Sequence, residues 1–261
     1  MEDKYEDIIY DKRDRVARIT INRPEAGNMF RATTLRELKD ALEDSRMDDA
    51  VRVVVISGAG GKFFCIGGDK ADLPKTHAYK GVIPVMDVYD LIDKHPRPVI
   101  AAVDGFAVGG GNVFHVICDF TIATERSVFR QVGPMMGSFD AGYGTWYLED
   151  LVGKKKAKEM WMLGKKYTAQ EALEMGLVNV VVPPEELEAE VDRWCQQLIK
   201  RGPQALYAIK ASFGAKHGGV AGFTRVAHDL LLSYYLDSRE AKELFKAFNE
   251  KRDPDEEDFY K

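Results

Sequence analysis

The stretch FAVGGGN, residues Phe106–Asn112, decides how this chain is organised. Its three glycines lie between two apolar runs, Pro98–Val103 and Val113–Cys118. Because glycine has no Cβ, such a run lets the backbone approach a ligand closely. At the start of a helix its N–H groups can also face a negative charge. A tight strand-to-helix turn with no ligand is the plainer interpretation of the same residues.

A second glycine pair favours the ligand-binding interpretation. It lies in FFCIGGD, residues Phe63–Asp69, shortly after the apolar run Val51–Ser57. Continuous apolar runs of this length are typical of strands buried on both faces of a sheet. Two N–H donors from two separate strand ends are what an oxyanion hole needs. The sequence therefore predicts that the two turns act together.

Strand and helix patterns alternate along most of the chain and predict an α/β protein. Ile8–Tyr10 and Val16–Ile21 indicate two strands joined by a polar turn over 11–15. Thr33 or Thr34 is expected to cap a helix that ends near Met47, and Thr168 with Glu171 forms a capping-box pattern. Residues 71–83 lack a period and predict a loop beside the site. We expect the α/β core over residues 1–202 and a helical region over 203–261.

Composition excludes several classes of function. The chain has 261 residues, 45% of them hydrophobic and 30% charged, with a net charge of −5, which disfavours nucleic acid as the main partner. The sequence contains no apolar run long enough for a membrane helix and no signal-peptide pattern, so we expect a cytoplasmic protein without a membrane partner. The three cysteines and five histidines are widely scattered and predict neither a disulfide nor a metal site.

With both glycine turns in view, the chain resembles the enoyl-CoA hydratase/isomerase (crotonase) superfamily, from about Ile19 to Arg252. The resemblance implies a ββα spiral core and a C-terminal helical region that forms homotrimers or homohexamers. It also implies an acyl-CoA thioester whose carbonyl oxygen lies between the N–H groups of Gly68 and Gly110. CoA is then part of the substrate, and no metal or redox cofactor follows.

Two departures from the family pattern argue against simple hydration. Hydratases of this family carry two glutamates that handle water, and the matching positions here are Val113 and Gly133. Neither residue can accept or donate a proton. We therefore do not expect an enoyl-CoA hydratase.

The stretch QVGPMMGSFDAGYG, residues 131–144, resembles two other branches of the family. One is 1,4-dihydroxy-2-naphthoyl-CoA synthase, which closes a ring by Dieckmann condensation. The other is 2-ketocyclohexanecarboxyl-CoA hydrolase, which opens a β-keto ring with water. Both resemblances imply that Ser138, Asp140 and Tyr235 are catalytic. A helix cap for Asp140 and core packing for Tyr235 are the alternatives.

The resemblance to the synthase also implies a bicarbonate base held by a glutamine, a threonine, a glycine and a tryptophan. Gln131, Gly133 and Trp161 match, but Val132 stands at the threonine position. The anion would lose a hydrogen bond there, at a cost of roughly 1–3 kcal/mol. Local strings such as Phe30–Thr34 and Gln131–Pro134 favour the hydrolase, and the synthase stays open as the alternative.

Further substrate and CoA contacts follow from the resemblance. The glycine turn and its loop contribute Ile66, Asp69, Lys70 and Tyr79. Relatives often carry a basic residue for the CoA phosphates at the Gly27 position, and Arg23 or Arg31 is expected to replace it here. Phe248 and Lys251 match positions that contact the nucleotide end of CoA. A non-catalytic scaffold of the same fold is the alternative of a different class. The retention of both glycine turns, with Ser138, Asp140 and Tyr235, argues against it.

Overall fold

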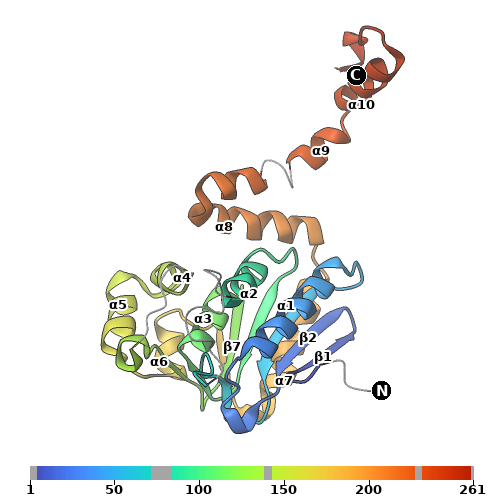
Figure 1. The fold of residues 1–261 in the computed structure, drawn as a ribbon. Coiled ribbons are helices and arrows are strands. Elements are labelled where there is room, and N and C mark those ends of the chain that lie inside the picture. Colours follow the sequence, from blue (N-terminus) through green and yellow to red (C-terminus); the bar gives the residue numbers. More distant parts are fainter. Residues whose placement is uncertain (1–4, 72–83, 138–142, 227–230, 260–261) are drawn as a thin grey trace. The chain divides into compact units, whose positions relative to one another are not determined.

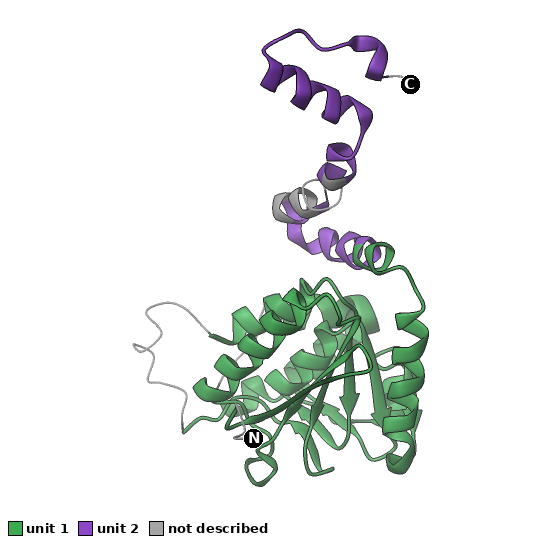
Figure 2. Cartoon of the chain, turned by 90° about the vertical axis from the view of Figure 1, so that its right-hand side faces the viewer, with its two compact units in different colours: residues 1–207 green, residues 208–261 purple. Residues whose placement is uncertain are grey.

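The structure is a computed structural model that describes residues 5–71, 84–137, 143–226 and 231–259 (Figure 1). The chain forms two compact units, residues 1–207 and 208–261 (Figure 2). The boundary lies inside helix α8 (Pro203–Arg225), whose first residue coincides with the start of the helical region expected from the sequence.

The first unit begins with a β-hairpin. Strands β1 (Ile8–Arg13) and β2 (Val16–Ile21) are antiparallel and pair from Ile8↔Ile21 to Arg13↔Val16. Only Asp14 and Arg15 form the turn, and both have positive φ angles, of 50° and 67°. A two-residue turn with two positive φ angles matches the twist of paired strands. The turn is therefore shorter than the polar pattern over 11–15 predicted.

Three ββα repeats follow the hairpin. Their strands and helices are β3 (Val53–Gly58), β4 (Phe63–Cys65) and α2 (Pro84–Asp93); β5 (Val99–Val103), β6 (Phe106–Val108) and α3 (Gly110–Ile117); β7 (Phe120–Thr124), β8 (Val128–Arg130) and α4 (Tyr143–Val152). In each repeat the first strand joins one sheet and the second strand joins another. Within each sheet the three strands are parallel neighbours. This arrangement confirms the α/β spiral.

The two sheets are completed by short strands. The six-stranded sheet has the order β1-β2-β3-β5-β7-β10, and the four-stranded sheet has the order β4-β6-β8-β9. Strand β9 (Tyr167–Thr168) is antiparallel to β8, and β10 (Val180–Val182) is parallel to β7. Consecutive repeats thus bring the ends of β4 and β6 side by side, which positions the two glycine turns.

Helix α1 (Ala32–Met47) begins earlier than the sequence predicted. Its first residue is Ala32, so the expected cap at Thr33 or Thr34 is wrong. The Thr34 hydroxyl accepts a hydrogen bond from the backbone N–H of Arg31 (3.1 Å) and donates to Asp7 (2.5 Å). A carboxylate from the segment before β1 therefore determines where this helix starts, which the local pattern could not show.

Three further helices follow in the first unit. They are α5 (Lys154–Leu163), α6 (Ala169–Glu174) and α7 (Leu187–Ile199). The capping box at α6 is confirmed, because Thr168 Oγ1 accepts from Glu171 N at 3.2 Å and Glu171 Oε2 accepts from Thr168 N at 2.8 Å. Short 3-10 turns cover Pro24–Ala26 (η1), Gly133–Met136 (η2) and Pro184–Glu186 (η3).

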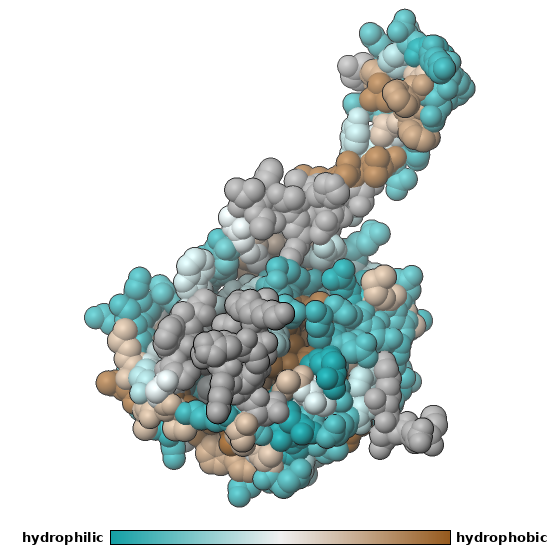
Figure 3. All heavy atoms as spheres, in the orientation of Figure 1, coloured by the Kyte–Doolittle hydropathy of each residue, from teal (hydrophilic) through white to brown (hydrophobic). Residues whose placement is uncertain are grey.

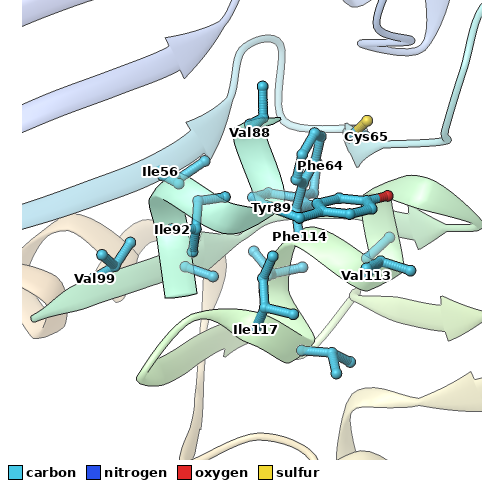
Figure 4. Packing of buried hydrophobic residues seen from close by; sticks show 14 of the residues in the cluster. Ile56, Phe64, Cys65, Val88, Tyr89, Ile92, Val99, Val113, Phe114 and Ile117 are labelled. Carbon is cyan, nitrogen blue, oxygen red and sulfur yellow. The ribbon is translucent and has the colours of Figure 1, made fainter. Parts of the chain in front are cut away.

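The central strands of the six-stranded sheet, β3, β5 and β7, are buried on both faces, as the apolar run in β3 predicts. Val54 and Ile56 belong to a large hydrophobic cluster with α1, α2 and α3, whereas Val53 and Val55 pack with α7 in a second cluster. In the large cluster the rings of Phe64, Tyr89 and Phe114 lie together beside Ile56 and Ile92 (Figure 4). This packing fixes α3, and with it the glycine turn at its start.

The second unit is helical in its described part. It contains the rest of α8, then α9 (Leu232–Leu236), α10 (Arg239–Glu250) and the short turn η5 (Glu256–Phe259). Large apolar side chains are exposed on this unit, and Figure 3 shows some as brown atoms. Among them are Phe213, Leu231, Tyr234, Leu236, Phe245 and Phe248. Among the helices described in both units, none is long and apolar enough to cross a membrane.

Candidate active site

The two glycine turns meet at the carboxyl ends of neighbouring strands. Strand β4 pairs with β6 in parallel, with Cys65 opposite Ala107, and each strand then leads into its glycines. A Cβ added to Gly67 would lie 3.3 Å from the backbone N of Gly110 and 3.4 Å from the Val108 carbonyl oxygen. The backbone of the first turn therefore contacts the start of α3, and only glycine leaves room for that contact.

Each glycine of the second turn meets a different constraint. Gly109 has φ 57° and ψ −125°, a conformation that L side chains rarely adopt. A Cβ on Gly110 would lie 2.7 Å from the ring of Phe30 and 3.2 Å from the Tyr89 hydroxyl. A Cβ on Gly111 would lie 1.9 Å from the Cys65 carbonyl oxygen. Gly109 is thus needed for its backbone conformation, and Gly110 and Gly111 are needed for close approach.

The amides of Gly68 and Gly110 are the donors that the site can offer. Neighbouring backbone groups are paired: Gly109 N donates to Arg130 O (3.0 Å), and Asp69 N donates to Phe30 O (2.9 Å). Within the described parts of the chain, neither Gly68 N nor Gly110 N donates a hydrogen bond. The N–H of Gly110 belongs to the first turn of α3, where no carbonyl of the helix can reach it. Two unused donors therefore lie on two adjoining turns.

No acid stands where a hydratase would need one. Val113 is 1% exposed and packs in the large hydrophobic cluster. Gly133 is buried and begins η2, so it carries no side chain to reach a substrate. Neither position therefore supplies an acid or a base.

One acceptor atom of Gln131 and one donor atom of Trp161 are buried without a hydrogen-bond partner among the described residues. Gln131 Nε2 donates to the Gly109 carbonyl at 3.3 Å, which places this side chain beside the glycine turn. In the described part of the chain, Gln131 Oε1 and Trp161 Nε1 have no hydrogen-bond partner, although both residues are buried. A Cβ on Gly144 would lie 2.8 Å from both the Trp161 ring and the Val113 side chain. Buried polar atoms of this kind indicate a bound polar molecule.

Gln131 Oε1 can accept a hydrogen bond and Trp161 Nε1 can donate one. A bicarbonate anion has three oxygens and needs further donors, and Val132 has no hydroxyl to supply one. Burying an anion with too few donors is costly. Among the described residues, Gln131 and Trp161 thus leave one buried acceptor and one buried donor unused.

Four other predicted contacts lie around the first glycine turn. The Ile66 side chain packs against Gly27, where a Cβ would lie 2.6 Å from Ile66 Cδ1. Arg23 Nη2 donates to Asp69 Oδ2 at 3.1 Å, and Lys70 Nζ donates to the Met136 carbonyl at 2.7 Å. Lys70 therefore links this turn to η2, which begins at Gly133, two residues after Gln131.

The predicted residues Tyr79, Ser138 and Asp140 lie outside the described residues, so their roles stay predictions. Tyr235 belongs to the second unit, where its hydroxyl donates to Glu240 Oε1 at 3.2 Å. Some loss of solvent and the negative charge of Glu240 raise the pKa of Tyr235. Phe248 is 81% exposed, and Lys251 ends α10 with a φ of 54°. Their contacts with CoA also stay predictions.

Tyr89 is a residue near the site that the sequence did not single out. It is 4% exposed, its hydroxyl lies 3.5 Å from the Gly110 carbonyl oxygen, and its ring packs on Phe114. An aromatic residue on an apolar helix face reads as core by default, so no local signal marked it. His115, in contrast, is structural as expected: it bonds Asn112 Oδ1 at 3.0 Å, and burial lowers its pKa to about 3. In the described residues, no group of three His, Cys, Asp or Glu side chains could hold a metal ion.

Comparison with known proteins defines the class to which this fold and these turns belong. The family model for enoyl-CoA hydratase/isomerase matches residues 11–258. The chain therefore belongs to the enoyl-CoA hydratase/isomerase family, whose members act on acyl-CoA substrates.

Solved structures agree over nearly the full length. An enoyl-CoA hydratase from Bacillus anthracis is 29% identical, with a TM-score of 0.73, and the match covers 96% of this chain and 98% of that one. An enoyl-CoA hydratase subunit I from Geobacillus kaustophilus is 30% identical, with a TM-score of 0.78 and coverages of 97% and 98%. DspI from Pseudomonas aeruginosa is 28% identical, with a TM-score of 0.78 and coverages of 98% and 99%.

Proposed function

We propose that this member of the family is a ring-cleaving hydrolase of a cyclic β-ketoacyl-CoA. The observation that carries the proposal is the combination of two unused amide donors, at Gly68 and Gly110, with no acid at either hydratase position. Stabilising a thioester enolate requires only the donors. Adding water across an enoyl double bond requires an acid and a base as well, and Val113 and Gly133 supply neither.

The reaction begins with the thioester oxygen between the N–H groups of Gly68 and Gly110. Water adds to the ring ketone, and the tetrahedral adduct collapses to a carboxylic acid with cleavage of the bond to the α-carbon. The electron pair of that bond becomes the thioester enolate, whose oxygen the two amides stabilise. A proton then adds to the α-carbon, so the product contains one water more than the substrate. Loss of one such donor typically raises the barrier by about 3–4 kcal/mol.

Gln131 and Trp161 support the water-adding direction. Each buries a polar atom that has no partner among the described residues: Gln131 Oε1 can accept a hydrogen bond from water, and Trp161 Nε1 can donate one to water. We assign to these side chains the binding of the water that attacks the ring, with Asp140 or Ser138 as its base. Tyr235 or Asp140 then protonates the α-carbon. In this proposal bicarbonate is not used.

The second candidate is 1,4-dihydroxy-2-naphthoyl-CoA synthase. The same two buried atoms favour it, because an anion with one hydroxyl group also contains a donor and an acceptor. Val132 argues against it, since the missing hydroxyl leaves the anion short of a hydrogen bond. The synthase needs the same enolate and the same amides, so only the products separate the two.

Assembly is part of the proposal. The exposed apolar side chains of the second unit, including Phe213, Phe245 and Phe248, support a homotrimer or homohexamer in which other copies cover them. A reducing, cytoplasmic setting fits the free thiols of Cys65, Cys118 and Cys195. Phe248 and Lys251 are assigned to the nucleotide end of CoA.

Product mass decides between these functions. The protein is incubated separately with 2-ketocyclohexanecarboxyl-CoA and with o-succinylbenzoyl-CoA, and products are identified by mass spectrometry. We expect the first substrate to gain one water and the second to stay unchanged. Loss of one water from the second substrate would establish the synthase instead. No change in either would contradict both candidates and favour the scaffold or another acyl group.

The acid Asp140 provides a second test. We expect Asp140→Asn to bind the CoA ester with unchanged affinity and to lose turnover by about 10²–10⁴-fold, the usual contribution of a general acid or base. Binding is measured by calorimetry and turnover by product mass. Turnover like that of the wild type would remove Asp140 from the mechanism.

A further inference from the structure

Arg23 joins three separate segments next to the first glycine turn. Its Nη1 donates to the Met29 carbonyl at 2.5 Å, and its Nη2 donates to Asp69 Oδ2 at 3.1 Å. Its Nε lies 3.7 Å from Asp7 Oδ1. The Arg23 side chain is 15% exposed, and that of Asp69 is 17% exposed. The guanidinium is therefore largely enclosed by acceptors of this chain.

The segment that carries Gly68 is otherwise held by a short ladder of backbone hydrogen bonds. Ile66 N donates to Gly27 O at 3.2 Å, Phe30 N to Gly67 O at 3.0 Å, and Asp69 N to Phe30 O at 2.9 Å. Arg23 contacts both strands of this ladder, at Met29 on one side and Asp69 on the other. Arg23 therefore adds a side-chain link between the two backbone segments of the ladder, directly after Gly68.

The third partner of Arg23 is Asp7, which is itself held in place by hydrogen bonds. Asp7 is 2% exposed and accepts hydrogen bonds from Arg31 Nε at 2.8 Å and from Arg31 Nη2 at 2.7 Å. Thr34 adds a third hydrogen bond at 2.5 Å. Asp7 is thereby fixed to the start of α1, so Arg23 is anchored at the end away from the glycine turn.

Charge gives Arg23 a second effect. Asp69 follows Gly68 directly, and its carboxylate would oppose a negative charge on a thioester oxygen bound at the Gly68 amide. The guanidinium of Arg23 offsets that carboxylate at hydrogen-bond distance. The same contact thus orients the turn and keeps its electrostatic potential favourable for an oxyanion.

We propose that Arg23 is a positioning residue that holds Asp69 and Met29 so that the Gly68 N–H faces the thioester oxygen, and that it does not bind the phosphates of CoA. The inference rests on the proposed placement of that oxygen at Gly68 and Gly110. It reassigns Arg23 from the nucleotide end of the substrate to the reacting end. Asp69 becomes the partner through which Arg23 acts.

Kinetics with two forms of the substrate test this role. Arg23→Gln and Arg23→Lys are compared with the wild type on the β-ketoacyl thioester of CoA and on the same thioester of pantetheine, which lacks the nucleotide. We expect Arg23→Gln to lower kcat about tenfold or more with both thioesters and to leave KM within about threefold. A defect confined to KM of the CoA ester and absent with pantetheine would overturn the inference. Arg23→Lys, which keeps the charge, should recover part of the loss.

The pair is tested by combining Arg23→Gln with Asp69→Asn. If Arg23 acts through Asp69, neutralising Asp69 removes the uncompensated charge, and the double variant should be less impaired in kcat than Arg23→Gln alone. Strictly multiplicative effects of the two substitutions would contradict coupling. Circular dichroism melting curves establish that each variant is folded before the comparison is made.

A spectroscopic measurement separates the inference from the proposed reaction. Cyclohexanecarboxyl-CoA with a ¹³C-labelled thioester carbonyl cannot be cleaved, and hydrogen bonds at the oxyanion hole lower its carbonyl stretching frequency. We expect a clear shift on binding to the wild type, a smaller shift in Arg23→Gln and an unchanged shift in the control Arg126→Gln. Arg126 pairs with Asp104 in the same way but is 51% exposed on another part of the unit.

Each outcome of this measurement has one meaning. A full shift in Arg23→Gln overturns the positioning role while the oxyanion hole stands. No shift in the wild type overturns the oxyanion hole and the inference with it. A shift without ring cleavage overturns the hydrolase alone.

Discussion

At the scale of single residues, the site depends on glycines, because they have no side chain. Gly67 and Gly111 allow the backbones around the two turns to lie in contact, and Gly110 leaves room for the Phe30 ring and the Tyr89 hydroxyl. The position of two N–H donors is set by that contact. Removing space at one glycine should therefore affect both stability and catalysis.

Gly111→Ala is expected to destabilise the protein by about 1–3 kcal/mol or more, because its Cβ would meet the Cys65 carbonyl oxygen, which is backbone and cannot rotate away. The measurement is the free energy of unfolding in urea. The matched control is Gly218→Ala in α8, where no atom lies within 4 Å of the added Cβ. There a helical alanine should be neutral or stabilising by about 0.5–1 kcal/mol. Equal effects at the two positions would contradict the contact argument.

The proposed water site gives a second prediction at this scale. Gln131→Met and Trp161→Phe keep the approximate shape but remove the buried acceptor and the buried donor. Each should slow ring hydrolysis by roughly 5- to 150-fold, which corresponds to a lost hydrogen bond of about 1–3 kcal/mol. Steady-state kcat is the readout. Urea unfolding establishes that each variant is folded, because Gln131→Met also removes the Nε2 hydrogen bond to the Gly109 carbonyl and Trp161→Phe leaves a smaller ring in the core.

At the scale of elements, α3 is a helix buried along its whole length. All eight residues from Gly110 to Ile117 are buried, and its polar side chains, Asn112 and His115, bond to each other at 3.0 Å. The His115 ring also packs on Phe129 at 4.8 Å between centroids. Burial holds the pKa of His115 near 3, against an ordinary value of 6.5, so the folded protein keeps this ring neutral.

His115 makes stability depend on pH in one direction. Above pH 6.5 the ring is neutral in both states and contributes no dependence on pH. Below that value the unfolded chain takes up the proton and the folded chain does not. The free energy of unfolding should then fall by up to about 1.4 kcal/mol per pH unit between pH 6.5 and pH 3.

The measurement is urea unfolding from pH 7 to pH 4. His115→Gln cannot titrate, so its slope against pH should be smaller than that of the wild type by this amount, even if its stability at pH 7 is lower. Carboxylates such as Asp7 contribute to both slopes and cancel in the difference. Identical slopes would show that His115 is protonated in the folded protein.

At the scale of the whole molecule, the described part of the second unit leaves several large apolar side chains exposed. Phe245 and Phe248 are 71% and 81% exposed on α10, whereas Glu243 and Ala247 on the same helix are buried. One narrow face of α10 is therefore buried within the unit, whereas its two phenylalanines are exposed. Other copies of the chain are the proposed cover.

Charge on that surface should weaken assembly. We expect the wild type to be a trimer or hexamer by light scattering, and Phe245→Asp with Phe248→Asp to shift it toward smaller species. Asn249→Asp adds a charge to the same helix at an exposed position and should leave the mass unchanged. A wild-type monomer, or a double variant of unchanged mass, would show that these residues do not form the interface.

Local physical chemistry determined much of this protein from the sequence alone. The apolar run of β3 predicted a strand with two buried faces, Thr168 and Glu171 predicted a capping box, and the glycine runs predicted turns after strands. Each of these signals depends on residues a few positions apart, where geometry follows from the chain itself. The family resemblance added the spiral, which the order of the strands confirms.

Tertiary structure alone decided where these local pieces meet. Helix α1 starts at Ala32 because Asp7, from the segment before β1, binds Arg31 and Thr34. The contact between Arg23 and Asp69 likewise joins residues distant in the chain. The burial of Gln131 Oε1 and Trp161 Nε1 without partners among the described residues is also a property of the folded protein alone. Such contacts depend on strand order and register, which pair residues through space, and a local pattern of apolar and polar residues does not contain that information.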